Sequence, residues 1–142
     1  MHIRDFDLDH DYDNVIHLWQ HAGPGVHVGP SDTRAALAQK LTRDPDLFLV
    51  LEEDGQIIGS VIGGYDGRRG LVYHLAVAEA QRGRGGGALL MNEVERRLRA
   101  KGCRKCYLLI AEGNEAVLGF YHHLGWSEMP VMLLAKTLTD AP

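Results

Sequence analysis

Cysteine is scarce in this sequence. The 142 residues include two cysteines, Cys103 and Cys106, which stand together in one Cys-x-x-Cys pair. A structural zinc site needs four ligands, and the chain has no second cysteine pair. A thioredoxin-type redox pair opens a helix after a strand, whereas this pair follows a predicted helix and enters an apolar run. The sequence therefore predicts two reduced cysteines and no metal.

Long apolar runs are also missing. The longest spans residues 106–111, far short of the roughly 20 residues of a membrane-spanning helix. The first residues are acidic and lack the apolar stretch of a secretory signal, so we expect a cytoplasmic protein. With 45% hydrophobic residues, the chain has apolar material for one buried core, and we expect a single domain over residues 1–142.

Basic residues are few in the first half of the chain. Residues 1–66 carry 12 acidic and 4 basic side chains, whereas residues 67–142 carry 7 and 11. The net charge of −4 disfavours a dedicated nucleic-acid binder. The asymmetry fits two alternatives. Either it is solvated surface charge, or the protein binds two ligands of opposite charge, of which the second is positively charged.

Apolar periodicity and turn residues predict an α/β chain with the element order βααβββαβαβ. The expected strands are Ile3–Asp7, Leu47–Glu53, Gln56–Gly64, Leu71–Ala78, Lys105–Ala111 and Val131–Leu138. The expected helices cover residues 12–22, 31–44, 88–101 and 115–124, and Asp11 is the expected N-cap of the first. Consecutive antiparallel strands followed by a strand–helix–strand unit indicate a mixed, mostly antiparallel sheet flanked by helices.

A glycine-rich turn joins the strand over 71–78 to the helix over 88–101. It reads Arg82-Gly-Arg-Gly-Gly-Gly87. Backbone N–H groups at a helix start bind phosphate, and glycines let a pyrophosphate approach them closely. A P-loop needs Lys-Ser/Thr after the glycines, and a dinucleotide fingerprint needs a third glycine at a different spacing and an acid near residues 103–107. Neither requirement is met, whereas the pattern Arg/Gln-x-x-Gly-x-Gly/Ala fits at every fixed position.

A second motif starts 32 residues later, with Asn114 followed by Tyr121, Gly125 and Trp126 at the spacing Asn-x₆-Tyr-x₃-Gly-Trp. Together the two motifs resemble the GCN5-related N-acetyltransferase (GNAT) superfamily over nearly the whole chain. Finer strings at residues 47–50, 63–70 and 101–103 resemble a small bacterial subgroup of these acetyltransferases. The resemblance implies the GNAT fold and an acetyl-CoA-dependent N-acetyltransferase that acts by direct attack in a ternary complex. The acceptor would be a small-molecule or peptide primary amine, without nucleic acid, membrane or metal, and the enzyme a monomer or homodimer.

The resemblance also implies residue roles. Strand residues would line the pantetheine arm, the glycine-rich turn would hold the pyrophosphate, and Asn114 would bind the pantetheine region while capping its helix. A phenol has a pKa of about 10 and can return a proton to a thiolate, so Tyr121 would be the general acid. Alternatively, Tyr121 is an aromatic residue of the core. The implied cofactor-binding residues are Leu75, Ala76, Val77, Arg82, Gly83, Arg84, Gly85, Gly86, Gly87, Ala88, Asn114 and Tyr121.

The base that deprotonates the amine is not evident. Leucines, Leu71 and Leu109, occupy the positions where some relatives carry a glutamate. The candidate replacements are Tyr73, Glu112 and Asp66. His74 ranks below them, because alternate residues of a regular strand face opposite sides and Tyr73 shares a side with Leu71 and Leu75.

Two other functions stay open from the sequence alone. The missing carboxylates favour a non-catalytic acyl-CoA-binding or regulatory domain on the same fold, whereas the presence of both Tyr121 and Asn114 favours the enzyme. A nucleotide-binding regulator would bind adenine nucleotides without needing the pantetheine arm.

Overall fold

The computed structural model describes residues 1–139. Its core is a five-stranded sheet in the order β1-β2-β3-β4-β5. The first four strands are antiparallel neighbours and β5 runs parallel to β4. The strands are β1 (His2–Asp5), β2 (Phe48–Glu53), β3 (Gln56–Tyr65), β4 (Gly70–Val77) and β5 (Cys106–Leu108). The prediction of a mixed, mostly antiparallel sheet is confirmed.

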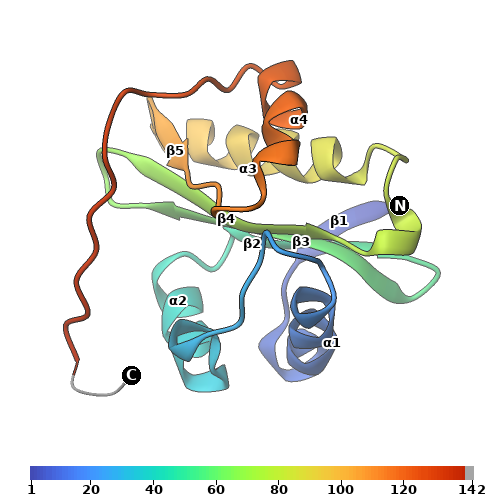
Figure 1. Cartoon of the computed structure of the whole chain (residues 1–142). Helices are drawn as coiled ribbons and strands as arrows, with labels where there is room; N and C mark the ends of the chain where they lie inside the picture. Colours follow the sequence, from blue (N-terminus) through green and yellow to red (C-terminus); the bar gives the residue numbers. More distant parts are fainter. Residues whose placement is uncertain (140–142) are drawn as a thin grey trace.

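Helices cover both faces of the sheet (Figure 1). The first face carries α1 (Leu8–Gln20), the short turn η1 (Pro30–Asp32) and α2 (Arg34–Arg43), and the second carries α3 (Gly86–Ala100) and α4 (Leu118–His123). Two further short turns, η2 (Glu79–Gln81) and η3 (Glu115–Val117), precede α3 and α4. No helix within residues 1–139 combines the length and apolar character needed to cross a membrane.

The central strands are buried on both sides, so each helical layer has its own core. Phe48 and Val50 of β2 pack with Trp19 on the side of α1, while Leu49 and Leu51 pack on the side of α3. Burying each such side chain contributes roughly 1.5–3 kcal/mol. This alternation explains why residues 47–51 read as one unbroken apolar run.

The first helix begins earlier than predicted. Asp7, not Asp11, is the N-cap, and its carboxylate accepts a hydrogen bond from Asp9 N. Asp11 is buried instead, where it binds the Arg4 guanidinium at 2.6 and 3.0 Å. Because both aspartates precede the apolar stripe, spacing alone does not distinguish the cap from the ion-pair partner.

The alternation of β4 is broken by a bulge. The pairing with β3 shifts register between Ser60 and Ile62, and His74 has the left-handed backbone angle φ 53°. As a result Tyr73 packs in the core beside α1, whereas Leu75 packs in the core beside α3. The expectation that Tyr73 and Leu75 share a face is therefore wrong, because an extra residue in one strand resets which side each later residue faces.

The predicted last strand is not formed. Within the described residues, 131–138 belong to no strand, and this segment leaves the body of the protein (Figure 1). Val131 is 75% exposed and Leu138 is 89% exposed. A strand needs a neighbour to pair its backbone groups, and apolar residues alone do not supply one. The element order is confirmed as far as α4 and corrected after it.

Candidate active site

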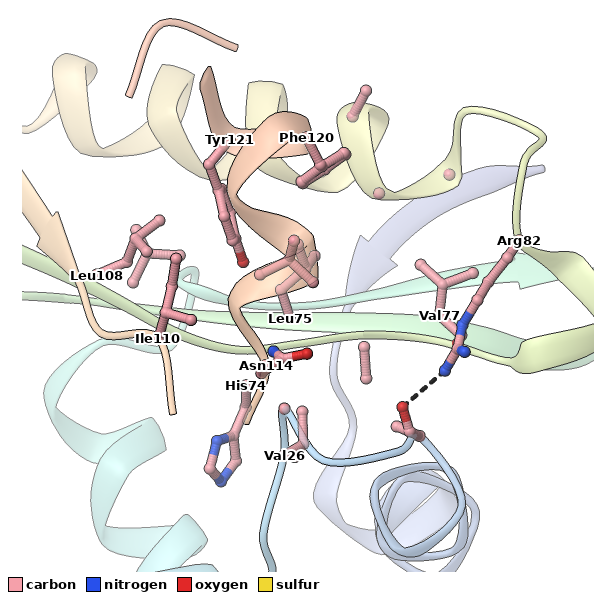
Figure 2. Close-up of a pocket in the computed structure, with 18 of the residues that line it drawn as sticks. Val26, His74, Leu75, Val77, Arg82, Leu108, Ile110, Asn114, Phe120 and Tyr121 are labelled. Carbon is pink, nitrogen blue, oxygen red and sulfur yellow. Dashed lines mark hydrogen bonds between the residues drawn. The ribbon is translucent and has the colours of Figure 1, made fainter. Parts of the chain in front are cut away.

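The sheet opens between β4 and β5. Their pairing ends at Val72 and Leu108, and the following residues of both strands line a cavity of about 590 Å³, the central cavity. The rest of its wall comes from the glycine-rich turn, from α4 and from the loop at residues 22–26. Figure 2 shows Tyr121 and Phe120 on one side of β4, with Val26 and His74 on the other.

The glycine-rich turn closes one end of the central cavity. Gly85 is the N-cap of α3 with φ 86°, and Gly83 has φ 80°, left-handed angles that other residues adopt at a cost. At the next two positions, Gly86 and Gly87, close packing leaves little room for a side chain. A Cβ on Gly86 would lie 2.8 Å from Leu51 Cδ2, and one on Gly87 would lie 3.1 Å from Phe120 Cζ. The helix start thus faces the cavity with few side chains to cover its N–H groups.

The two arginines of this turn are engaged within the protein. Arg82 donates to the backbone oxygen of Ala22 at 2.6 Å (Figure 2) and to that of Val77 at 3.2 Å. It therefore holds the loop at residues 22–26 against β4. Arg84 pairs with Glu53 at 2.7 Å and does not line the cavity. The other eleven predicted cofactor-binding residues do line it.

Tyr121 projects from α4 toward β4, with its hydroxyl end in the cavity (Figure 2). Burial raises the pKa of this phenol above its usual value of 10.0. A raised pKa keeps the phenol protonated through the neutral range, as a proton donor requires. Among residues 1–139 no hydrogen bond engages its hydroxyl group.

Asn114 also lines the cavity, but its side chain does not cap η3, so the predicted second role is wrong. It lies against Gly25, where a Cβ would come within 2.4 Å of Asn114 Nδ2. The amide is thereby held at the cavity wall by the loop at residues 22–26, because only glycine allows that approach.

The candidate bases are dispersed. Tyr73 lines the cavity, but burial, and secondarily the charges of Asp32 and Asp44, raise its pKa to about 12, which leaves little phenolate at neutral pH. Asp66 caps the turn between β3 and β4, where it accepts from the backbone N–H groups of Arg68 and Arg69. Neither Asp66 nor Glu112 is among the residues that line the cavity.

Sequence reasoning ranked His74 below the other candidate bases and missed its pairing with Asp32. His74 lines the central cavity, and its Nε2 lies 3.0 Å from Oδ1 of Asp32 in η1. These residues are 42 positions apart, so no local motif joins them. Their pairing depends on the bulge in β4, which turns the His74 side chain toward α1 and η1.

A second cavity, of about 1010 Å³, lies between β5, α4 and residues 126–133. It meets the first at Leu108–Ile110, Tyr121 and Leu124, but it lacks the glycine-rich turn and is walled partly by the exposed segment after α4. Its larger volume therefore does not make it the better site. It contains Cys106, whose thiol has a pKa raised to about 11, chiefly by burial. Within residues 1–139 no group of histidine, cysteine and carboxylate side chains could hold a metal ion.

Ion pairs within the protein engage at least half of the early carboxylates. The pairs that join an early carboxylate to a cation include Asp5–Arg97, Asp11–Arg4, Asp44–Lys40, Asp46–Lys101, Glu52–Arg4 and Glu53–Arg84. No aspartate or glutamate of the described residues lines the central cavity. The cavity lining therefore supplies no acidic side chain that would recognise a positively charged acceptor, and the charge of the acceptor stays a prediction.

Comparisons with known proteins agree with this geometry. The model of the acetyltransferase (GNAT) family matches residues 12–126. An acetyltransferase of Yersinia pestis is 42% identical over 97% of this chain and 96% of its own length, and one of Pectobacterium atrosepticum is 42% identical over 99% and 97%. The solved structure of PaiA N-acetyltransferase from Thermoplasma acidophilum, in complex with coenzyme A, shares the fold with a TM-score of 0.79 at 18% identity, covering 92% of each chain.

Proposed function

This chain belongs to the acetyltransferase (GNAT) family, and we propose that it transfers the acetyl group of acetyl-CoA to a primary amine, of a small molecule or a peptide, by direct attack in a ternary complex. The observation that carries the proposal is the central cavity, which runs from a bare helix start to Tyr121, a half-buried residue whose raised pKa keeps its phenol protonated. It has room and donors for an extended acyl thioester.

The cofactor binds along the opened edge of β4. The backbone N–H groups from Arg82 to Ala88 hold the pyrophosphate, with the partial positive charge of the α3 N-terminus. The main chain at Leu75–Val77, left unpaired by β5, binds the amides of the pantetheine arm, and Asn114 adds a side-chain amide. Because Arg82 and Arg84 are engaged elsewhere, the main chain supplies most of this binding.

The reaction is acyl transfer between two bound substrates. The amine nitrogen attacks the thioester carbonyl, and a main-chain N–H of β4 stabilises the oxyanion of the tetrahedral intermediate. The C–S bond then breaks, and Tyr121 gives its phenolic proton to the departing thiolate.

Direct attack is supported by what the cavity wall lacks. Among the described residues, no cysteine, serine, threonine or lysine lines the central cavity, so the usual nucleophiles of a covalent acetyl-enzyme are missing there. Both cysteines lie at the α3–β5 junction, and the raised pKa of Cys106 keeps that thiol protonated and unreactive.

The experiment is thiol release from acetyl-CoA in the presence of a panel of amines, with the acetylated product identified by mass. We expect release that depends on both protein and amine. Coenzyme A should also raise the melting temperature more than an adenine nucleotide that lacks the pantetheine arm. Binding of coenzyme A without turnover on any amine would favour the non-catalytic domain, and equal stabilisation by both ligands would favour the nucleotide-binding regulator.

A further inference from the structure

His74 occupies an unusual place on β4. It is one of two described residues other than glycine with positive φ, at 53°, a backbone conformation that residues other than glycine adopt at a cost. The strain is held by specific contacts. The imidazole ring packs edge-on against Trp19 with ring centroids 4.5 Å apart, and Nε2 lies 3.0 and 3.2 Å from the two carboxylate oxygens of Asp32.

Asp32 is itself tightly fixed. Only 6% of its surface is exposed. Its Oδ2 accepts a hydrogen bond from Gly29 N at 3.0 Å, and its backbone oxygen accepts one from the Tyr12 hydroxyl at 2.9 Å. A buried carboxylate held in this way orients the group that it binds. Two other titratable groups lie nearby. Tyr12 belongs to α1, and Tyr73 neighbours His74 on β4.

The contact between His74 and Asp32 determines which nitrogen of the imidazole ring can accept a proton. An ionised carboxylate only accepts hydrogen bonds, so the proton of a neutral His74 ring resides on Nε2. Nδ1 then carries a lone pair, and no hydrogen bond within residues 1–139 engages it. His74 lines the central cavity, whereas no carboxylate of the described residues does, so the lone pair on Nδ1 is the candidate proton acceptor of this site.

Resting on the proposed function, we propose that His74 is the catalytic base that takes the proton from the acceptor amine, and that Asp32 is its positioning residue. Tyr121 and His74 flank β4 from opposite sides (Figure 2). The general acid thus lies on the side of α4, and the base lies on the side of α1 and η1. We expect the acceptor to approach from the side of the base.

The proton balance is complete without another reactant. The ammonium form of the acceptor gives one proton to His74 Nδ1, and Asp32 stabilises the imidazolium that forms. The neutral nitrogen attacks, so that the C–N bond forms and the C–S bond breaks. Tyr121 protonates the sulfur, the attacking nitrogen returns its second proton to the phenolate, and His74 releases its proton to solvent.

The test compares two acceptors of equal length. One is an alkylamine, which is protonated at neutral pH because its pKa is about 10, and the other is an alkoxyamine, which arrives neutral. The variant is His74→Asn, since asparagine tolerates positive φ. We expect its kcat/KM for the alkylamine to fall about 10²-fold or more, with a much smaller loss for the alkoxyamine. The ratio of the two values does not depend on the fraction of protein that is folded.

Asp32→Asn should move the same ratio in the same direction, because its amide can donate to Nε2 and place the ring proton on Nδ1. The matched control is His10→Asn, which removes another histidine–aspartate pair, with Nδ1 2.9 Å from Asp7 Oδ2, on the exposed start of α1. It should leave the ratio unchanged. An active wild-type protein whose His74→Asn variant keeps the wild-type ratio would overturn the role of His74 alone. A wild-type protein inactive with every amine would overturn the proposed function as well.

Discussion

The half-buried residue Tyr121 allows the most direct test of the proposed chemistry. It lies on a short helix, packed edge-on against Phe120 with ring centroids 5.1 Å apart. Trp126 flanks it on the other side at 6.4 Å. These contacts hold the ring, while the hydroxyl has no protein partner within residues 1–139. Packing and chemistry therefore use different parts of one side chain and can be separated by removing the oxygen alone.

Tyr121→Phe keeps the ring contacts and removes the proton. We expect kcat to fall about 10²-fold, because general acids contribute roughly 10²–10⁴. The dissociation constant of acetyl-CoA should change little, as measured by titration calorimetry. Tyr107→Phe on β5, outside the central cavity, is the control and should behave as wild type. An unchanged kcat in the Tyr121 variant would reduce this residue to a packing role.

At the scale of elements, α3 is tied to the sheet by one charged cluster. Glu93 accepts hydrogen bonds from Arg96 and Arg97, and Arg97 also reaches Asp5 of β1 and the backbone oxygen of Asp46. The hydrogen bonds from these two arginines lower the pKa of Glu93 from 4.5 to about 2. The contribution of Glu93 to the stability of the fold therefore requires its ionised form.

The sign of the pH effect follows from that depressed pKa. The contribution of Glu93 is fully present above about pH 4.5 and is lost as the pH falls toward 2. Glu93→Gln should lower the free energy of unfolding by about 1 kcal/mol at neutral pH. Urea unfolding at decreasing pH should show this difference shrinking in the acid range.

Glu79→Gln, at an exposed position in η2, serves as the control and should have little effect at any pH. A difference between wild type and Glu93→Gln that stays constant down to about pH 3 would show that the ionised carboxylate is not the source of the stability.

Elements with local signals were predicted well. The strands over residues 47–53 and 56–64 follow from unbroken apolar residues and an Asp-Gly turn, and α3 follows from its periodicity and the preceding glycines. Tyr121 and the glycine-rich turn were singled out because their spacing is itself the motif. The structure brings them to one cavity, and their roles stay predictions. These features depend on neighbours in the sequence.

The bulge in β4 and the partner of His74 were not predicted, for a physical reason. A bulge is decided by the pairing with β3, where the register shifts opposite Ser60 and Ile62. Ser60 accepts a hydrogen bond from Trp19 Nε1 at 2.8 Å and donates to the backbone oxygen of His74 at 3.3 Å. The conformation at His74 therefore depends on residues 14 and 55 positions away in the sequence, which no periodicity along one strand reports.

At the scale of the whole molecule, the segment after α4 is apolar but uncovered. Met132 and Leu134 are each 86% exposed, and β5 has a paired strand on one side only within the described residues. Unpaired sheet edges and exposed apolar segments favour association with another chain. Because every copy carries both features, we expect a homodimer in which each copy covers the segment of the other.

Light scattering should then report twice the monomer mass of 15.7 kDa. The double variant Met132→Lys and Leu134→Lys should shift the protein to the monomer, because it places charge in the apolar contact. Leu89→Lys, at an exposed leucine on α3 that is 45% accessible, is the control and should remain dimeric. A monomeric wild-type protein at micromolar concentration would contradict this expectation.

The central cavity has a further consequence, because its wall combines Val26 and His74 from one face of the sheet with Phe120 and Tyr121 from the other. Under the proposed mechanism, the acceptor lies on the side of α1 and η1, and the thioester lies on the side of α4. The acetylated amine and the thiol product need not pass each other, so we expect no compulsory order of departure. We expect that the acetylated amine can leave, and a new acceptor can enter, while coenzyme A is still bound.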